Sequence, residues 1–207
     1  MDVVRVERFG GPEVMRPASM ADPSPGAGEA VIEVTASDVM FLDTLLRSGW
    51  GEGFFPVRPP YVPGSGVVGT SSGGRVVADT KQDVGGAEIP VGGYASRAVV
   101  AESELVPVPS GLTDHQAVAF LHDGPTLQSL LPFVAGPRVL VAAAAGGAGV
   151  LLVQSLAARG LHVVAAARGS AKTALVRSPT CRGWTARSAV RRWSGPSPRR
   201  RKGAIAR

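Results

Sequence analysis

The segment PRVLVAAAAGGAGVLLVQSLAARG, residues 137–160, constrains the fold of this chain more than any other stretch. A short apolar run leads into four alanines and a glycine-rich turn, and an amphipathic segment and a second apolar run follow. Apolar runs of this length predict buried strands, and the segment between them has the length of a crossover helix. The order predicts the opening of a βαβ unit: a strand over 138–142, a turn over 144–149, a helix over 149–159 and a strand over 162–167.

The glycine turn has the position of a dinucleotide-binding loop. The fingerprint of such loops is G-x-G-x-x-G between a strand and a helix, and residues 144–149 read AAGGAG, with alanine in place of the first glycine. Gly146 would let the backbone approach a pyrophosphate, Gly149 would let helix and strand pack closely, and the helix N-terminus attracts anions. The alternative is a tight turn without a ligand. We expect cofactor contacts from Ala145, Gly146, Gly147, Ala148 and Gly149.

The residues after the second apolar run bear on the choice of cofactor. NAD enzymes usually place an acidic residue there to bind the ribose hydroxyls, but VVAAARGSAKTA contains none. Arg168, Ser170 and Lys172 stand there instead, and positive charge suits a 2′-phosphate. The sequence therefore favours NADPH over NADH, unless these are ordinary solvated residues at the start of the next helix.

Positive charge is concentrated at the end of the chain. Residues 178–207 hold nine of the 22 Lys and Arg residues, none of the 16 Asp and Glu residues, two of the three tryptophans and the single cysteine, Cys181. One cysteine excludes an internal disulfide, and no segment resembles a secretory signal or a membrane span. We expect a cytoplasmic protein with no membrane partner. Nucleic-acid binding through the Arg-rich tail is a weaker alternative, because the tail lacks a recognised binding motif.

The first half of the chain shows β patterning. DVVRVERF and EAVIEVTAS alternate in the manner of strands, and further short strands are separated by Gly and Pro. DVMFLDTLLRSG suggests a short helical turn. TDHQAVAFLHDGPTLQSLL has helical spacing, with Thr113 or Asp114 as its cap and an interruption at Gly124–Pro125.

These segments together resemble the medium-chain dehydrogenase/reductase superfamily, in its zinc-free, quinone-reductase-like branch. VLVAAAAGGAGVLLVQSLAARG is similar to the family's cofactor loop, and VTASDVMFLDTLLRSGW, PYVPGSGVVG, GGYASRAVV and LVPVPSGLTDHQAVAFLHDGPT follow in the family's order. The resemblance implies an α/β protein: a GroES-like β-rich catalytic domain over 1–120, a partial Rossmann domain over 121–177, and then a basic, disordered tail over 178–207.

The resemblance also addresses metal binding. Zinc-dependent members carry cysteine at the place of Met40 and Gly-His-Glu at the place of residues 64–66, which read Gly-Ser-Gly here. A thioether and a short hydroxyl do not replace a thiolate and an imidazole on zinc. The histidines at 115, 122 and 162 show no ligand spacing, and we interpret each as a surface or helix histidine. We expect no metal.

Without zinc, the resemblance implies hydride transfer from NADPH to a quinone or an α,β-unsaturated carbonyl. No general acid is identified. The alternatives for the pocket residues are core packing for Phe41 and Tyr61 and a structural hydrogen bond for Asp43. The resemblance places Thr126 near the nicotinamide, and Met40, Phe41, Asp43, Trp50 and Tyr61 in the substrate pocket wall.

The chain departs from the family in two places. GTSSGGR is shorter than the corresponding segment, and the resemblance stops near KTALVRS, where the family continues with Leu-Gly-Ala-Asp and further strands. One GC-rich back-translation of residues 179–187, shifted by one base, reads Ala-Asp-Val-Ser-Trp-Val-Asp-Arg-Ser, which suggests a change of reading frame. The chain is then either a working reductase or a truncated remnant. The resemblance allows a homodimer for the full-length family, but we do not expect that dimer here.

Overall fold

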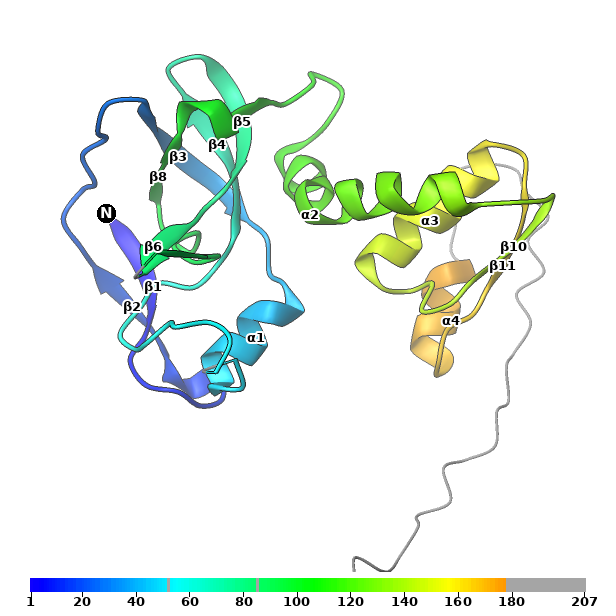
Figure 1. The fold of residues 1–207 in the computed structure, drawn as a ribbon, viewed down its shortest axis with the longest axis horizontal. Helices are drawn as coiled ribbons and strands as arrows, with labels where there is room; N and C mark the ends of the chain where they lie inside the picture. The colour runs from blue at the N-terminus through cyan, green and yellow to red at the C-terminus, as the bar shows by residue number, and fades with distance from the viewer. Residues whose placement is uncertain (52, 85, 178–207) are drawn as a thin grey trace, which may run out of the picture. The chain divides into compact units, whose positions relative to one another are not determined.

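The structure, a computed structural model, describes residues 1–51, 53–84 and 86–177, which divide into two compact units between Pro125 and Thr126 (Figure 1). This boundary lies inside a helix, as does the boundary expected after residue 120. The tail expected to be disordered, 178–207, lies outside the described residues. The β-rich first unit and the βαβ second unit agree with the expected fold class.

The first unit is built on a five-stranded sheet with the order β8-β3-β4-β5-β9. All four pairings are antiparallel. A register shift between Val34 and Ala36 in β3 marks a bulge, and a bulge increases the local twist. The strands are β3 (Glu29–Ser37), β4 (Gly66–Ser71), β5 (Gly74–Asp79), β8 (Arg97–Ala101) and β9 (Val106–Pro107).

Buried side chains cover both faces of β4. Val67 packs with Ile32 and Val76 in one buried cluster, whereas Val68 packs with Val77 and Val118 in another. Successive side chains of a strand point to opposite faces, so β4 is covered on both. The shortened segment GTSSGGR forms a tight hairpin in which Ser71 pairs with Gly74.

Smaller elements complete the first unit. Helix α1 (Phe41–Ser48) runs over two turns, longer than the single turn suggested by the sequence, and ends at Gly49, whose φ of 82° is left-handed. Two antiparallel hairpins join β1 (Asp2–Val6) to β2 (Met15–Ser19) and β6 (Gln82–Val84) to β7 (Ala87–Ile89). Short 3-10 helices span Pro12–Val14 and Glu102–Glu104.

Helix α2 (Asp114–Leu130) shows one sequence prediction to be right and another to be wrong. Thr113 is the cap: its Oγ1 accepts from the backbone N–H of Gln116 at 3.3 Å, and Gln116 Oε1 accepts from the backbone N–H of Thr113 at 3.0 Å. The expected interruption at Gly124–Pro125 does not occur, because the helix continues through Pro125. Proline removes one backbone bond, and the residues on both sides of Pro125 remain helical.

The second unit has the predicted strand–helix–strand order. Parallel strands β10 (Arg138–Val141) and β11 (His162–Ala165) flank α3 (Gly147–Ala158), and a 3-10 helix (Leu131–Phe133) and α4 (Ser170–Arg177) lie at the two ends. Both strands end earlier than expected, and α3 begins two residues before Gly149, because the glycines themselves form its first turn. The buried core contains Leu127, Leu131, Val141, Ala144, Val153, Leu156, Val163, Ala165 and Val176.

Candidate functional site: the glycine loop and the residues around α1

The glycine loop of the second unit connects β10 to α3 through a tight turn. Ala143 has a φ of 51°, in the left-handed region that residues with a Cβ rarely adopt, and its carbonyl accepts the N–H of Gly146 at 2.9 Å. The sequence did not identify this strained position. Strained backbone of this kind persists where the surrounding structure holds it, often at ligand sites.

The glycines of the loop have different roles. A Cβ on Gly149 would lie 2.4 Å from the carbonyl oxygen of Ala143, so only glycine lets α3 pack this closely on the turn. Gly146 and Gly147 are exposed, and Gly147 is the first residue of the helix. The first N–H groups of a helix have no partner within it, so those of residues 147–149 are the donors that an anion would meet.

Positive charge follows the second strand of this unit. Arg168, Ser170 and Lys172 are all exposed, and between β11 and the end of α4 there is no acidic residue. Ser170 and Lys172 lie in the first turn of α4, which agrees with the alternative that they are ordinary solvated residues at the start of a helix. Arg168 precedes the helix. Thr126 is exposed, whereas Ala145 and Ala148 are half-buried.

In the first unit, Asp43 anchors the start of α1. Its Oδ2 accepts the backbone N–H of Met40 at 2.7 Å and the hydroxyl of Tyr94 at 3.1 Å. Asp43 is only 6% exposed, and burial raises the pKa of its carboxyl, while the two hydrogen bonds act in the opposite direction. Burial and the nearby Asp43 charge likewise raise the pKa of Tyr94. The carboxyl is thus committed to holding the helix and Tyr94.

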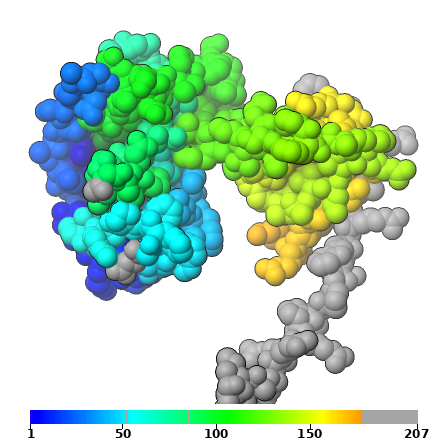
Figure 2. Space-filling view, viewed as in Figure 1, coloured from blue at the N-terminus to red at the C-terminus, as the bar shows by residue number. Residues whose placement is uncertain are grey.

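The other residues expected in the pocket wall differ in their exposure. Tyr61 is buried in a core cluster with Val6 and Leu46, and burial raises the pKa of its hydroxyl to about 12. Phe41 and Trp50 are 77% and 62% exposed at the two ends of α1, which lies on the outer surface in Figure 2. Both side chains present apolar surface to solvent.

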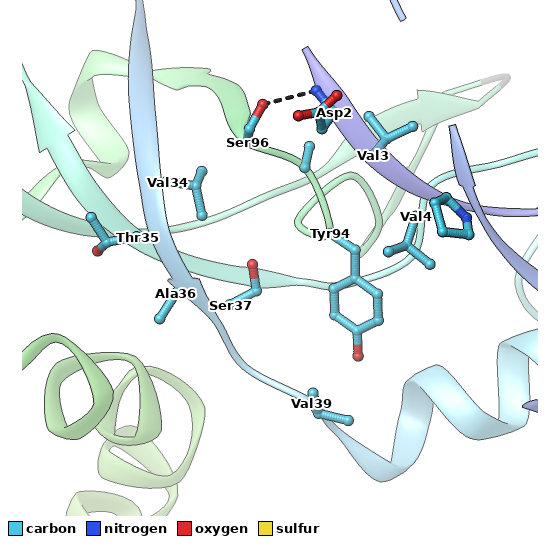
Figure 3. A pocket seen from close by; sticks show the side chains of 12 residues that line it. Asp2, Val3, Val4, Val34, Thr35, Ala36, Ser37, Val39, Tyr94 and Ser96 are labelled. Carbon is cyan, nitrogen blue, oxygen red and sulfur yellow. Dashed lines mark hydrogen bonds between the residues drawn. The ribbon is translucent and has the colours of Figure 1, made fainter. Parts of the chain in front are cut away.

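A shallow pocket of about 530 Å³ lies beside this region, between β1, β3 and the segment before β8 (Figure 3). Tyr94 lines it and connects it to Asp43 through the hydroxyl bond described above. Ser37 also lines it, and donates its hydroxyl to the carbonyl of Gly93 at 2.6 Å. None of the five residues expected from the sequence lines this pocket, so Tyr94 is an addition that the tertiary structure makes.

A second polar cluster was not foreseen from the sequence. His122 on α2 lies between two carboxylates: Nδ1 is 2.6 Å from Asp38 Oδ2, and Nε2 is 3.0 Å from Asp79 Oδ1. Asp38 also accepts the N–H of Gly66 at 3.1 Å. Hydrogen bonds with Asp38 and then Asp79 raise the pKa of His122 to about 10, against the effect of burial. The cluster ties α2 to the sheet.

The cluster contains histidine and aspartate, which are common metal ligands, but its side chains are not arranged as a metal site. The imidazole stands between the carboxylates, and the described residues include no group of three or more His, Cys, Asp or Glu side chains that could hold a metal ion. His115 and His162 are exposed. In the described part of the chain, no helix is long and apolar enough to cross a bilayer.

The chain is similar in sequence to several known proteins. No protein-family model matches the chain. It is 35% identical to quinone oxidoreductase of Mus musculus over 174 residues (79% of this chain, 51% of the relative). It is 32% identical to quinone oxidoreductase of Pseudomonas aeruginosa over 173 residues, with coverages of 78% and 51%. The chain spans about half the length of the curated relatives it matches.

Solved structures show the same likeness. Quinone oxidoreductase from Thermus thermophilus, solved alone and with NADPH, superposes with a TM-score of 0.69 at 35% identity, covering 84% of this chain and 56% of that chain. The Escherichia coli quinone oxidoreductase complexed with NADPH superposes with a TM-score of 0.70 at 26% identity, covering 84% and 55%.

Proposed function

Because the chain belongs to the quinone-reductase-like branch of the medium-chain dehydrogenase/reductase superfamily, we propose that it acts as an NADPH-dependent, zinc-free oxidoreductase. Its acceptor would be a quinone or an α,β-unsaturated carbonyl compound. The observation that carries the proposal is the glycine loop at the N-terminus of α3, followed after β11 by the exposed Arg168 and Lys172.

The residues of the second unit fit the cofactor. The N–H groups of Gly147 and its two successors would bind the pyrophosphate, while Gly149 keeps the helix close to the turn. Arg168 and Lys172 would bind the 2′-phosphate, with Ser170 as a hydrogen-bond donor. Complexes with NADPH are known for the similar proteins from Thermus thermophilus and Escherichia coli.

The residues of the first unit would receive the acceptor. When bound, NADPH supplies a hydride to an electron-poor carbon or ring. Phe41 and Trp50 offer exposed apolar faces for a flat acceptor. Asp43 holds Met40 and Tyr94 in place through its hydrogen bonds, and we assign it a positioning role rather than proton transfer. Thr126 remains the residue expected near the nicotinamide.

Calorimetric titration with NADPH and NADH tests the cofactor assignment. The parent chain should bind NADPH more tightly, and Arg168→Asp should weaken NADPH binding by about 10- to 100-fold, the range of a charge-assisted hydrogen bond, with a much smaller effect on NADH. Arg138→Asp is the matched control, because Arg138 is an exposed arginine at the opposite end of β10 from the glycine loop. Equal affinity for both cofactors would count against the assignment.

A second candidate is a remnant that binds cofactor but turns over slowly. It is favoured by one observation: among the described residues of the second unit, the sheet holds two parallel strands. Poor positioning of the hydride donor costs rate even when binding persists. NADPH oxidation with simple quinones should be compared between the 207-residue chain and a chain with the downstream reading frame restored. Equal rates would rule out the remnant.

A further inference from the structure

The Asp38–His122–Asp79 cluster has a chemical property that the proposed function leaves unused. Both ring nitrogens of His122 face a carboxylate oxygen, at 2.6 Å for Nδ1 and 3.0 Å for Nε2. A neutral imidazole has one N–H donor, whereas the imidazolium has two, so this geometry is that of a protonated ring. Hydrogen bonds with Asp38 and then Asp79 raise the pKa of His122 accordingly. The cluster therefore holds a proton at neutral pH.

The two contacts of the imidazolium differ in strength. Asp38 is 11% exposed and also accepts the backbone N–H of Gly66 at 3.1 Å, so both of its oxygens are engaged. Asp79 is 34% exposed, and its Oδ1 has no hydrogen-bond partner of good geometry among the described residues. The ring itself is 27% exposed. The Nε2 proton is therefore the one that a bound molecule can take, while Nδ1 stays with Asp38.

The cluster adjoins the residues expected in the acceptor pocket. Asp38 lies in the segment between β3 and α1, two residues before Met40. Burial raises the pKa of Asp43, and the charge of Asp38 adds to that effect, which places the two carboxyl groups near each other. Asp43 in turn accepts the backbone N–H of Met40. The proton on His122 is thus held beside the part of the first unit where the acceptor is expected.

Glycine at position 66 makes room for this cluster. A Cβ there would lie 2.8 Å from a side-chain carbon of Leu121 and 3.0 Å from the carboxyl carbon of Asp38. Zinc-dependent members of the family carry glutamate at this position, and such a side chain would push against Asp38 and the turn of α2 that carries His122. The cluster and the glycine therefore belong together in this chain.

We propose that His122 donates the proton that completes reduction of the acceptor, an inference that rests on the proposed function. The carbonyl oxygen of the acceptor binds Nε2 in place of Asp79. As a hydride adds to the β-carbon of an α,β-unsaturated carbonyl, the C=C electron pair shifts toward the carbonyl, and its oxygen takes the Nε2 proton. The acceptor gains two electrons from the nicotinamide cofactor and becomes an enol, which tautomerises to the saturated ketone. The solvent returns a proton to the neutral imidazole.

Asp38 keeps the ring ready for this step. Its bond to Nδ1 fixes the orientation of the imidazole, and after the transfer the remaining Nδ1–H still donates to the same carboxylate. The ring thus presents the same nitrogen in each turnover. General acids contribute about 10²–10⁴-fold to a rate, so loss of the Nε2 proton has a measurable effect.

Two acceptors with different proton requirements test this role. 2-Cyclohexen-1-one takes a hydride and a proton, whereas the N-methylacridinium cation becomes neutral by taking a hydride alone. Glutamine has no proton acidic enough to transfer, so His122→Gln should lower the enone rate at least about 100-fold relative to the acridinium rate. His115→Gln is the matched control, since His115 is an exposed histidine on the same helix, and it should leave the ratio of the two rates unchanged.

A binding measurement gives a readout that does not need turnover. When 2-cyclohexen-1-one is added to the full chain without reduced cofactor, the ring resonances of His122 should shift in NMR spectra, because the carbonyl oxygen replaces Asp79 at Nε2. Titration to about 50 mM covers the millimolar affinity of a fragment-sized ligand. The resonances of His115 and His162, which are both exposed, should move much less.

The outcomes separate this inference from the proposed function. If the ratio of the two rates is the same in His122→Gln and in the parent, whether both rates persist or both fall, His122 is only structural and the proposal is overturned. A parent that reduces neither acceptor refutes the proposed function instead, and the NMR titration then decides the role of His122. A shift confined to His122 supports that role, and a His122 ring that does not respond overturns it.

Discussion

The ion pairs of His122 predict a loss of stability at alkaline pH. The folded pKa of His122 is about 10, against 6.5 for the free side chain, chiefly because it bonds Asp38 and then Asp79. A group whose pKa is raised by folding stabilises the protein fully below its unfolded pKa and loses that contribution as pH rises through the folded value. The stabilisation should therefore be complete below pH 6.5 and decline toward pH 10.

The magnitude follows from the same shift after a correction for solvent. At about 1.4 kcal/mol per pKa unit, the full shift would correspond to about 5 kcal/mol. The His122 and Asp79 side chains are 27% and 34% exposed, so solvent screens the pair. The Asp79 contact is also imperfect, because its Oδ1 lies 3.0 Å from Nε2 but has no hydrogen-bond partner of good geometry among the described residues. We expect about 1–2 kcal/mol.

Urea denaturation followed by circular dichroism across this pH range measures the effect. The free energy of unfolding of the parent should fall by about 1–2 kcal/mol between pH 6.5 and 10, and His122→Gln should flatten most of that slope. His115→Gln is the control, since His115 is an exposed histidine on the same helix. A parent profile without slope, or a His122→Gln profile that retains the slope of the parent, would refute the reasoning.

Three further predictions concern the glycine loop, α1 and metal. Gly149→Ala should destabilise the second unit by about 2 kcal/mol, because its Cβ would meet the Ala143 carbonyl; Gly73→Ala, with open space around it, should be neutral, and hydrogen exchange of α3 reports the difference. Asp43→Ala should cost about 1–2 kcal/mol by removing the acceptor for Met40 and Tyr94, measured by thermal denaturation; an unchanged midpoint would contradict the anchoring role. Elemental analysis should find no stoichiometric zinc, and about one zinc per chain would refute the zinc-free assignment.

Local signals in the sequence were sufficient for the elements that short-range chemistry specifies. The strand–glycine–helix–strand order around residues 138–165 and the cap at Thr113 both depend on residues within a few positions of one another. The limits of those elements were less well predicted. The continuity of α2 through Pro125 was not predicted, because a proline inside a helical pattern ordinarily marks an interruption.

The candidate site divides in the same way. The sequence by itself determined the glycine loop, the cations that follow β11 and the absence of the family's zinc ligands, because each is a pattern of neighbouring residue types. Only the tertiary structure brought Asp38, Asp79 and His122 together and joined Tyr94 to Asp43. The side chains in these contacts are distant in the chain. These side chains meet because the sheet and α2 bring distant parts of the chain together, and no local periodicity of the sequence predicts such a contact.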